Sequence, residues 1–424
     1  LEDIPDLCKR YGIHSIIIAI PTLKGSKLNH VIDLCVSTHC AVQLLSDPQL
    51  VGSGTPQQGA FRELNPADFL SRDEVTLDTD QISGYLTGKT VLVTGGGGSI
   101  GSELCRQVMR FKPGKLLIFD IYENCAYELL MELQQKYGRD IPVTVLIGSI
   151  RDKKRLDEVF ETYHPTVVFH AAAHKHVPLM EVSPAEAVKN NVLGTKNLLV
   201  SASEHDVERF VQLSTDKAVN PTSVMGCTKR ICEMLIQTFA GNTDMKCVAV
   251  RFGNVLGSHG SVIPLFEAQI KKGGPVTLTD PNIERYFMTI PEAAQLVLQA
   301  GALAESGNIY VLDMGEPVKI MDLAKQLIRF YGYEPGVNME IKIVGLRPGE
   351  KLYEELMMDE EQDKMRRTQH NKIFVASPRS IDLAEFYGQL QELAAAAEHN
   401  DEGVVQQLAK MIPTFTPTRQ NLKL

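Results

Sequence analysis

Short hydrophobic runs alternate with longer amphipathic segments through the middle of the chain. Six of the runs have the length and composition of strands buried on both faces, and apolar residues with helical spacing follow them. These predicted strands occupy residues 90–93, 115–119, 143–147, 166–170, 209–213 and 246–251. A regular alternation of strands and helices predicts an α/β fold with a Rossmann-type, doubly wound parallel sheet.

The start of the chain is organised differently. A strand over residues 14–20, a helix over 28–36 and a second strand over 41–45 form one β-α-β piece. This piece is too small to bury a core by itself. We therefore interpret residues 1–48 as the remnant of a larger N-terminal α/β domain.

The rest of the chain divides by composition. Residues 49–85 are rich in Gly, Pro, Gln and acidic side chains, which predicts a linker with a short helix near residues 66–70. Residues 86–424 are predicted to form the main domain. Its predicted parts are a dinucleotide-binding core over 86–252, a smaller lobe at the carboxyl edge of the sheet over 253–375, and a helical tail over 380–412.

Composition adds a few constraints. The 424 residues are 44% hydrophobic and 22% charged, which is ordinary for a soluble globular protein. With 43 Lys and Arg against 52 Asp and Glu, the net charge of -9 disfavours nucleic acid or an anionic membrane surface as a partner. The sequence shows no apolar run of the roughly 20 residues that cross a bilayer, so the chain is predicted to be soluble. The 8 Cys residues show neither a CxxC pair nor zinc-ligand spacing, which predicts reduced thiols.

A glycine-rich turn with the sequence TGGGGSIG follows the first predicted strand, at residues 94–101. Gly95 permits the tight turn, Gly98 lets the backbone approach a pyrophosphate, and Gly101 allows close packing of the next helix. The start of that helix favours an anion through its N–H groups and dipole. The turn predicts a dinucleotide site, with a glycine turn that holds no ligand as the alternative. The expected contacts are Gly95, Gly98, Ser99, Ile100 and Gly101.

Asp120 ends the second predicted strand, 19 residues beyond Gly101. A carboxylate in this place accepts hydrogen bonds from the hydroxyls of an adenosine ribose and disfavours a 2′-phosphate, so NAD is preferred over NADP. The alternative interpretation of Asp120 is a cap for a helix that begins at residue 121.

Further cofactor contacts are expected where the third and fourth strands end. Ser149 and Ile150 could flank the adenine, although Asp152 beside them could instead cap a helix. Ala171 and Ala172 follow the fourth strand and are small enough for the backbone to pass beneath a cofactor.

Three histidines near these alanines invite a metal interpretation, because imidazole is a common metal ligand. His170, His174 and His176 sit on a strand end and a loop, and the sequence arranges no carboxylate beside them. We therefore predict no metal site.

The segment after the fifth strand carries the candidate chemistry. Thr215, Asp216 and Lys217 follow the strand, and Met225 and Lys229 open the next helix. Together with the glycine turn, this arrangement resembles the extended short-chain dehydrogenase/reductases, which carry a Tyr-x-x-x-Lys pair on that helix. Met stands here in place of Tyr, and a thioether neither deprotonates a hydroxyl nor donates a strong hydrogen bond.

Longer motifs narrow the resemblance. With the glycine turn they make the chain similar, over about residues 60–424, to the membrane-associated, long-form UDP-N-acetylglucosamine 4,6-dehydratases. Members of this group carry transmembrane helices and a second nucleotide-binding-like domain before the catalytic one, and Met replaces the same Tyr in them. The motifs are residues 171–181, 214–217, 251–255 and 346–351.

The resemblance implies an NAD-dependent dehydration of UDP-N-acetylglucosamine without net redox. The sugar would be oxidised at C4, water would be eliminated across C5 and C6, and the stored hydride would return to C6. Lys217 would be the C5 base, Asp216 the acid for the C6 hydroxyl, and Thr215 a hydrogen-bond partner of O4. Lys229 would bind the nicotinamide ribose. The group that takes the O4 proton stays open between Lys217, Asp216 and a water relayed by Thr215.

The two reacting side chains place a demand on the backbone. Neighbouring residues in a strand point to opposite faces, so Asp216 and Lys217 must lie on a turn if both are to face one sugar. An exposed, salt-bridging turn without catalytic function is the alternative interpretation of this pair.

The resemblance also implies how the nucleotide sugar is held and where the protein works. Arg suits a diphosphate through bidentate hydrogen bonds, and Glu can accept from ribose hydroxyls. A D-xylo product with C5 retained, a homo-oligomer, and a place on the cytoplasmic face of the inner membrane through an N-terminal region missing here are further expectations. The candidate substrate contacts are Lys175, His176, Asn254, Arg285, Arg347 and Glu350.

Two other functions remain open at this stage. A UDP-sugar 4-epimerase would use the same cofactor, but its chemistry depends on the Tyr that is missing here and needs no C6 acid. A non-catalytic NAD-binding module would tolerate Met225.

Overall fold

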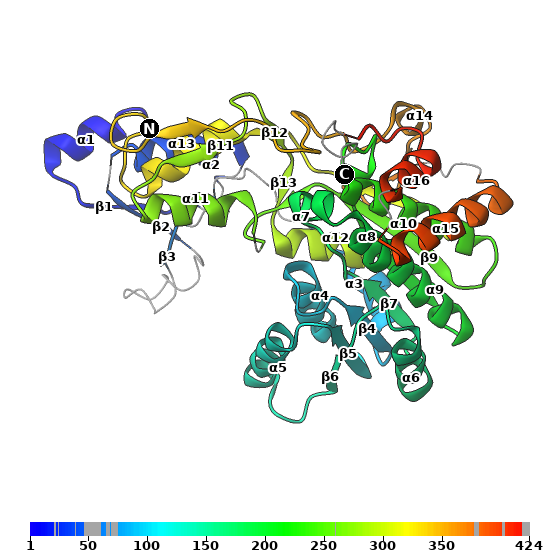
Figure 1. The fold of residues 1–424 in the computed structure, drawn as a ribbon. Coiled ribbons are helices and arrows are strands. Elements are labelled where there is room, and N and C mark those ends of the chain that lie inside the picture. The colour runs from blue at the N-terminus through cyan, green and yellow to red at the C-terminus, as the bar shows by residue number, and fades with distance from the viewer. Residues whose placement is uncertain are drawn as a thin grey trace. The chain divides into compact units, whose positions relative to one another are not determined.

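Figure 1 shows the computed structural model of the chain. It describes residues 1–20, 23, 25–38, 40–45, 61–64, 68, 75–258, 260–376, 381–400 and 403–417. These residues belong to two compact units, each with its own hydrophobic core. The large unit comprises Val75–Asn254, Ile290–Met314 and Leu346–Leu424, and the small unit comprises Leu1–Glu74, Val255–Thr289 and Gly315–Gly345.

A nine-stranded sheet forms the centre of the large unit, in the order β17-β18-β14-β9-β8-β7-β4-β5-β6 (Figure 1). The strands from β14 to β6 in this order pair in parallel, whereas β18 and β17 pair antiparallel at one edge. The predicted Rossmann-type parallel sheet is confirmed. The strands are β4 (Thr90–Thr94), β5 (Lys115–Asp120), β6 (Val143–Ile147), β7 (Val167–His170), β8 (Arg209–Thr215), β9 (Lys246–Phe252), β14 (Ile309–Leu312), β17 (Arg366–Arg367) and β18 (Ile373–Ala376).

Helices pack on this sheet in two groups, because the strands are apolar toward both of their faces. Helices α3, α4 and α12 pack together, and α6, α9 and α10 form the second group. The helices are α3 (Thr79–Leu86), α4 (Ser99–Arg110), α5 (Glu123–Tyr137), α6 (Lys153–Tyr163), α7 (Val177–Val182), α8 (Pro184–Ala187), the π-helix η3 (Val188–Leu193), α9 (Gly194–Glu204), the 3-10 turn η4 (Asp216–Ala218), α10 (Val224–Ala240), α12 (Ile290–Ala302), α14 (Asp359–Gln362), α15 (Leu383–Glu398) and α16 (Val404–Met411).

The small unit is built from the N-terminal β-α-β piece and two later segments of the chain. Strand β1 pairs in parallel with β2, and β3 pairs antiparallel with β2. Its elements are α1 (Ile4–Tyr11), β1 (Ser15–Ile18), α2 (Gly25–Val36), β2 (Ala41–Leu45), β3 (Phe61–Glu63), α11 (Val262–Lys271), β11 (Val276–Leu278), β12 (Glu284–Arg285), β13 (Phe287–Met288), β15 (Val318–Lys319), α13 (Ile320–Phe330) and β16 (Ile341–Ile343), while β10 (Asn254–Val255) spans the boundary between the units.

The N-terminal β-α-β piece shares its core with the later segments. Ile32 of α2, Phe266 of α11 and Leu327 of α13 are all fully buried in one cluster. Gln326 of α13 donates a hydrogen bond to Asp33 of α2 over 3.0 Å. The sequence suggested a piece without a core of its own, and the structure supplies that core from residues 255–289 and 315–345. The helix predicted near residues 66–70 lies outside the described residues, except for Asp68.

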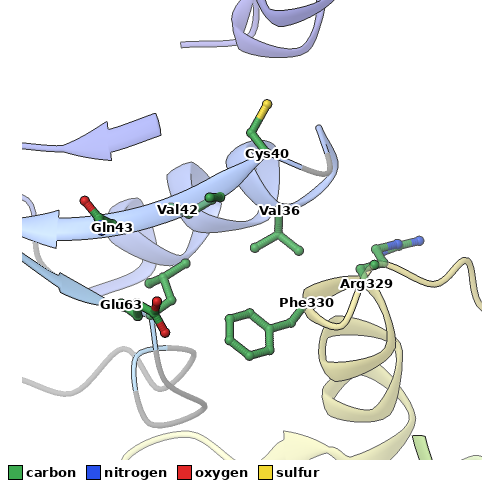
Figure 2. A pocket seen from close by; sticks show the side chains of 10 residues that line it. Val36, Cys40, Val42, Gln43, Glu63, Arg329 and Phe330 are labelled. Atoms are coloured by element: carbon green, nitrogen blue, oxygen red, sulfur yellow. The ribbon is translucent and has the colours of Figure 1, made fainter. Parts of the chain in front are cut away.

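A cavity of about 220 Å³ lies in the small unit, between strands β2 and β3 and the end of α13. Figure 2 shows the Phe330 ring turned toward Val36, while the guanidinium of Arg329 points away from it. The residues that line this cavity include none of the predicted site residues. The candidate chemistry therefore lies elsewhere.

A buried network of two arginines and two glutamates crosses the core of the large unit. Arg251 of β9 is fully buried and pairs with Glu233 of α10 at 2.8 Å and with Glu361 of α14 at 2.7 Å. Arg230 pairs with Glu233 at 2.8 Å and lies 3.6 Å from Glu361. Ser214 of β8 donates a further hydrogen bond to Glu233 over 2.7 Å. The network balances its charges and ties β8, β9, α10 and the segment around α14 together.

The pKa values in this network follow from burial and charge pairing. Burial alone raises the pKa of Glu233, but Arg251, Arg230 and the Ser214 hydroxyl outweigh burial and hold that pKa at about 2. Burial likewise lowers the pKa of Arg251, and its two carboxylate partners reverse this and raise it. Glu233 and Arg251 are therefore held in their charged forms at neutral pH.

Among the helices of the described residues, none combines the length and the apolar character needed to cross a membrane.

We predict that Glu233→Gln lowers the free energy of unfolding by about 3 to 5 kcal/mol, because it leaves buried arginine charge uncompensated. The exposed pair Lys410–Glu392 is the matched control, and Lys410→Gln should change stability by less than about 1 kcal/mol. Urea unfolding at neutral pH measures both effects, and equal losses in the two variants would contradict the prediction.

Acid gives a second measure of the same pair. The folded-state pKa of Glu233 is about 2 against an ordinary value of 4.5, so its contribution to stability is present above pH 4.5 and is lost as the pH falls toward 2. The Gln variant should lack this part of the acid sensitivity. Unfolding curves at a series of pH values between 5 and 2 measure it.

Candidate functional site

The glycine turn packs its backbone directly on the loop that follows β7. Gly95 has a φ of +66°, and a Cβ there would lie 2.6 Å from the backbone N of Ala172. A Cβ on Gly101 would collide with the carbonyl oxygen of Gly95. Helix α4 begins at Ser99, and its N-cap, Gly98, offers no side chain to the helix terminus. Backbone alone thus forms the surface at the start of this helix, which is the arrangement a pyrophosphate requires.

Asp120 closes the turn from the side. Its Oδ2 accepts a hydrogen bond from the N–H of Gly97 over 2.8 Å, and its Oδ1 accepts one from Tyr122 N over 2.9 Å. Helix α5 begins at Glu123, and its N-cap is Tyr122. Asp120 therefore does not cap this helix, whose start the sequence predicted at residue 121. The carboxylate lies partly buried at the end of β5, beside the glycine turn.

The ends of β6 and β7 lie beside β4 and β5 at the same sheet edge. Ile150 is buried, and a Cβ on Gly194 would meet its side chain at 2.8 Å. Asp152 is the N-cap of α6 and accepts from Arg155 N over 3.0 Å, as the alternative interpretation of this segment had it. Ser149 accepts a weak hydrogen bond from Arg151 N over 3.2 Å.

His170 is enclosed by hydroxyl groups. Its Nδ1 lies 2.7 Å from the Thr94 hydroxyl and its Nε2 lies 2.9 Å from the Thr195 hydroxyl. Burial lowers the pKa of His170 to about 3, so the ring is neutral at physiological pH. His174 and His176 are exposed in the following loop. The described residues do not bring these three rings together as ligands of one ion.

Another His does lie in a possible metal-binding group among the described residues. Asp157, Glu204 and His205 approach one another closely. The ammonium of Lys153 already lies 2.6 Å from Asp157 and 3.0 Å from Glu204. A cation of the protein itself thus already lies between the two carboxylates of this group.

Five polar side chains meet where β8 ends, and we call them the Lys217 cluster. Thr215 donates to Asp216 Oδ1 over 2.8 Å, and the ammonium of Lys217 donates to the same oxygen over 3.0 Å. Lys217 also donates to Asn254 Oδ1 over 3.0 Å, and Oε1 of Glu354 lies 3.8 Å from its Nζ. Asp216 and Lys217 lie on the 3-10 turn η4. The sequence predicted a turn here, because only a turn lets both side chains face one ligand.

The Lys217 cluster is largely hidden from solvent. The side chain of Asp216 is 0% exposed, that of Glu354 4% and that of Lys217 22%. Among the described residues, Oδ2 of Asp216 has no hydrogen-bond partner although it is buried. The exposed turn with a surface salt bridge, which was the alternative interpretation, is therefore wrong. A buried carboxylate oxygen without a partner is what a site that receives a ligand or a proton presents.

Glu354 is the member of this cluster that the sequence analysis missed. It follows the motif at residues 346–351, but no local pattern marks it, because Glu350 and Glu355 beside it are carboxylates as well. Asn254 had been assigned to the nucleotide, whereas the structure places its amide oxygen on Lys217.

Met225 and Lys229 lie one turn apart on α10, and both are buried. Burial lowers the pKa of Lys229, while Cys232 and Glu233 act against that shift. Asn191 of the π-helix η3 connects α10 to the loop after β7, since its amide accepts from His174 N over 2.8 Å and donates to the Thr228 hydroxyl over 3.0 Å. The loop below the glycine turn and the helix with Lys229 are therefore fixed to each other.

The remaining candidate residues fall into three places. Lys175 and His176 are exposed in the loop before α7. Arg347 is exposed, and its backbone N–H donates to Glu350 Oε2 over 3.1 Å. Arg285 belongs to the small unit, where its guanidinium donates to Glu284 O over 2.7 Å.

The segment with Arg347 and Glu350 is anchored next to the Lys217 cluster. Thr222 donates to Gly349 O over 2.9 Å, and the ammonium of Lys351 donates to Val219 O over 3.0 Å. Gly349 has a φ of +76°, and a Cβ there would lie 2.8 Å from Ser223 Cβ. The motif at residues 346–351 thus contacts residues 219–223, the segment that follows η4.

The sequence matches a family model described as "Polysaccharide biosynthesis protein" over residues 91–378. The capsular polysaccharide biosynthesis protein CapD of Staphylococcus aureus is 54% identical over 84% of this chain and 60% of its own length. An inverting UDP-N-acetylglucosamine 4,6-dehydratase of Campylobacter jejuni is 34% identical over 63% of this chain and 76% of its own length. A UDP-glucose 4-epimerase of Rickettsia rickettsii is 33% identical over 79% of this chain and 98% of its own length. The chain spans about three fifths of the length of the first of these relatives.

Solved structures share the fold. The X-ray structure of Pen from Bacillus thuringiensis superposes with a TM-score of 0.64 at 34% identity, over 69% of this chain and 90% of that one. The dTDP-glucose 4,6-dehydratase DesIV of Streptomyces venezuelae was solved as a double mutant with NAD bound. It superposes with a TM-score of 0.58 at 20% identity, over 74% of this chain and 99% of that one.

We predict that Gly95→Ala lowers the free energy of unfolding by about 1 to 3 kcal/mol, because Ala is strained at a positive φ and its Cβ meets Ala172. Gly84→Ala is the matched control, since Gly84 is exposed on α3 with open space around it and Ala favours a helix. Urea unfolding of both variants measures the difference. A Gly95→Ala protein as stable as the control would show that the turn is looser than its contacts indicate.

Proposed function

Because the chain belongs to the polysaccharide biosynthesis protein family, we propose that it is an NAD-dependent lyase that eliminates water from UDP-N-acetylglucosamine to give a UDP-4-keto-6-deoxy sugar. The observation that carries this proposal is the buried pair Asp216 and Lys217 on one turn, with Met225 in place of the usual Tyr. A dehydration needs a base at C5 and an acid at the C6 hydroxyl, and this pair supplies both types of group.

The residues around the glycine turn fit NAD. The backbone surface from Gly95 to Ser99 leaves room for a pyrophosphate, and Asp120 lies where a carboxylate meets a ribose. Ala171 and Ala172 pass beneath the turn, and Lys229 on α10 is the candidate for the nicotinamide ribose. When bound, NAD supplies a reversible hydride acceptor, so that no net oxidation of the sugar occurs.

The side chains of the Lys217 cluster account for the proton movements. Thr215 holds O4 of the sugar, Lys217 removes the proton from C5, and Asp216 protonates the hydroxyl that leaves C6 as water. Lys217 must be neutral and Asp216 protonated before this step. The hydrogen bond of 3.0 Å between them lets one proton pass from the ammonium to the carboxylate and create both forms together.

The nucleotide part of the substrate is assigned to residues outside this cluster. Arg347 suits the diphosphate, Glu350 suits the ribose, and Lys175 with His176 is assigned to the hexose. Asn254 is better suited to orienting Lys217 than to binding uridine, because its amide oxygen accepts from that ammonium. Assembly into a homo-oligomer and membrane attachment through a preceding region remain part of this proposal.

A UDP-sugar 4-epimerase is the second candidate, favoured by the similarity to the Rickettsia protein. Epimerisation needs a group that moves the O4 proton, for which Tyr is the usual choice, and Met225 cannot act in that way. Epimerisation also gives no function to an acid beside C6. The Asp216–Lys217 pair therefore favours dehydration.

We predict that the protein, incubated with NAD and UDP-N-acetylglucosamine in deuterium oxide, releases a 4-keto-6-deoxy product with deuterium at C5. Mass spectrometry and proton NMR follow the reaction, and the C5 configuration of the product tests the expected D-xylo outcome. Formation of the 4-epimer would support the epimerase instead. An unchanged sugar would leave a non-catalytic NAD-binding module.

We further predict that Lys217→Met and Asp216→Asn each lower kcat by about 100-fold or more, because each removes a proton-transfer group. Lys154→Met is the matched control, since Lys154 is exposed on α6, and it should keep the wild-type rate. Initial rates and the Kd for NAD are measured for all three. Wild-type rates in Lys217→Met would remove Lys217 from the reaction.

A further inference from the structure

Glu354 is a buried carboxylate that faces the ammonium of Lys217 from a distant part of the chain. Its Oε1 lies 3.8 Å from Lys217 Nζ, and its side chain is 4% exposed. At that distance the two charges interact directly, and solvent screens them little. The roles assigned to the cluster so far leave Glu354 without a function.

The position of Glu354 is fixed from both sides. On one side, Lys351 donates to Val219 O over 3.0 Å. On the other, Arg251 of the buried network donates to Leu356 O over 3.0 Å. The carboxylate is therefore held against Lys217 by backbone contacts that a surface side chain would not have.

Two carboxylates face the Lys217 ammonium within the cluster. Asp216 on its own turn and Glu354 on the returning segment contribute two carboxylates against one ammonium, and Asn254 contributes a neutral amide. Helix α10, which packs against the turn, carries Lys229 and the pair Arg230 and Glu233, whose charges are matched within the buried network. The carboxylate of Glu354 therefore adds a second buried negative group beside the Lys217 ammonium.

We propose that Glu354 is a positioning residue that keeps the proton on Lys217 between turnovers and stabilises the positive charge that Lys217 gains when it takes the proton from the sugar. This inference rests on the proposed function for its catalytic consequence. Its electrostatic part concerns the protein alone.

The proton balance of one turnover shows where Glu354 acts. First an N–H bond of Lys217 breaks and an O–H bond of Asp216 forms, so that both become neutral. The C5–H bond then breaks toward the Lys217 nitrogen, and the Asp216 proton joins the C6 hydroxyl, which leaves as water. The elimination leaves Lys217 as ammonium and Asp216 as carboxylate. When the hydride returns to C6, solvent returns one proton to C5, and the proton that O4 lost in the oxidation passes to solvent, so the pair begins the next cycle in its charged forms. Glu354 stays ionised throughout and faces the charge that appears on Lys217 in the second step.

The direct test is an NMR titration of Lys217 in the full chain labelled with ¹³C at lysine Cε. Lys217→Met identifies the resonance. Removing a negative charge at this distance should lower the pH at which Lys217 loses its proton by about 1 unit or more in Glu354→Gln. Glu354→Asp keeps the charge but moves it farther from Lys217, so its midpoint should lie between those of Glu354→Gln and the wild type. Glu355→Gln is the matched control, because the neighbouring Glu355 pairs with Lys351 instead and should leave Lys217 unchanged.

The kinetic test uses the same variants. In Glu354→Gln we expect kcat to fall about tenfold to a hundredfold and the pH–rate profile to move to lower pH, with the KM for UDP-N-acetylglucosamine and the Kd for NAD unchanged. A merely structural role would change the unfolding midpoint without moving the titration of Lys217 or the pH profile.

The outcomes separate the two proposals. If wild-type protein neither dehydrates the sugar nor exchanges its C5 hydrogen, the proposed function fails, and the NMR titration still decides whether Glu354 holds the Lys217 proton. If Lys217 titrates identically in wild type and Glu354→Gln, the inference about Glu354 is overturned whatever the activity. Should Glu354→Gln not fold, the titration of Glu354→Asp against Glu355→Gln decides, since a longer separation of the charges must still lower the Lys217 midpoint.

Discussion

Arg251 holds two carboxylates on one fully buried guanidinium, and the chemistry at the sheet edge depends on that arrangement. Through Glu233 the network reaches Ser214, the residue before Thr215 and the turn η4. Through its own guanidinium it reaches Leu356, two residues beyond Glu354. Because Arg251 is fully buried, moving either carboxylate away would leave its charge uncompensated. One network thus fixes both sides of the Lys217 cluster, although none of its charged groups belongs to the cluster.

The parts of the molecule that follow local rules were predictable from the sequence. Parallel strands buried on both faces appear as continuous apolar runs, so β4 to β9 were predicted to within two residues at each end, whereas β3 lies in the segment predicted as a linker. The chemistry expected of Asp216 and Lys217 requires a turn, and both residues lie on η4. Glu354 and the Asn254 contact were not predicted, because they reach Lys217 only through long-range packing that periodicity does not report.

The small unit shows on a larger scale that long-range packing is not predictable from local sequence patterns. The N-terminal β-α-β piece has the pattern of a remnant, yet its buried Ile32 packs in one cluster with Phe266 and Leu327, which come from far along the chain. The glycine turn lies at the other extreme, since its contacts with Ala172 and Asp120 follow from a single local motif at the end of a strand. Sequence reasoning works where the contacts of a feature are encoded by neighbouring residues.

The Lys217 cluster draws its members from three separate stretches of the chain, at residues 215–217, 254 and 354. During synthesis these stretches leave the ribosome in that order. A nascent chain that ends before Glu354 already contains the complete glycine turn and the strands around it, but its Lys217 faces only one carboxylate, and Arg251 still lacks Glu361. The cofactor half of the site can therefore be complete while the reacting half is not. The Lys217 cluster is complete only after the C-terminal segment has folded back onto β8 and β9.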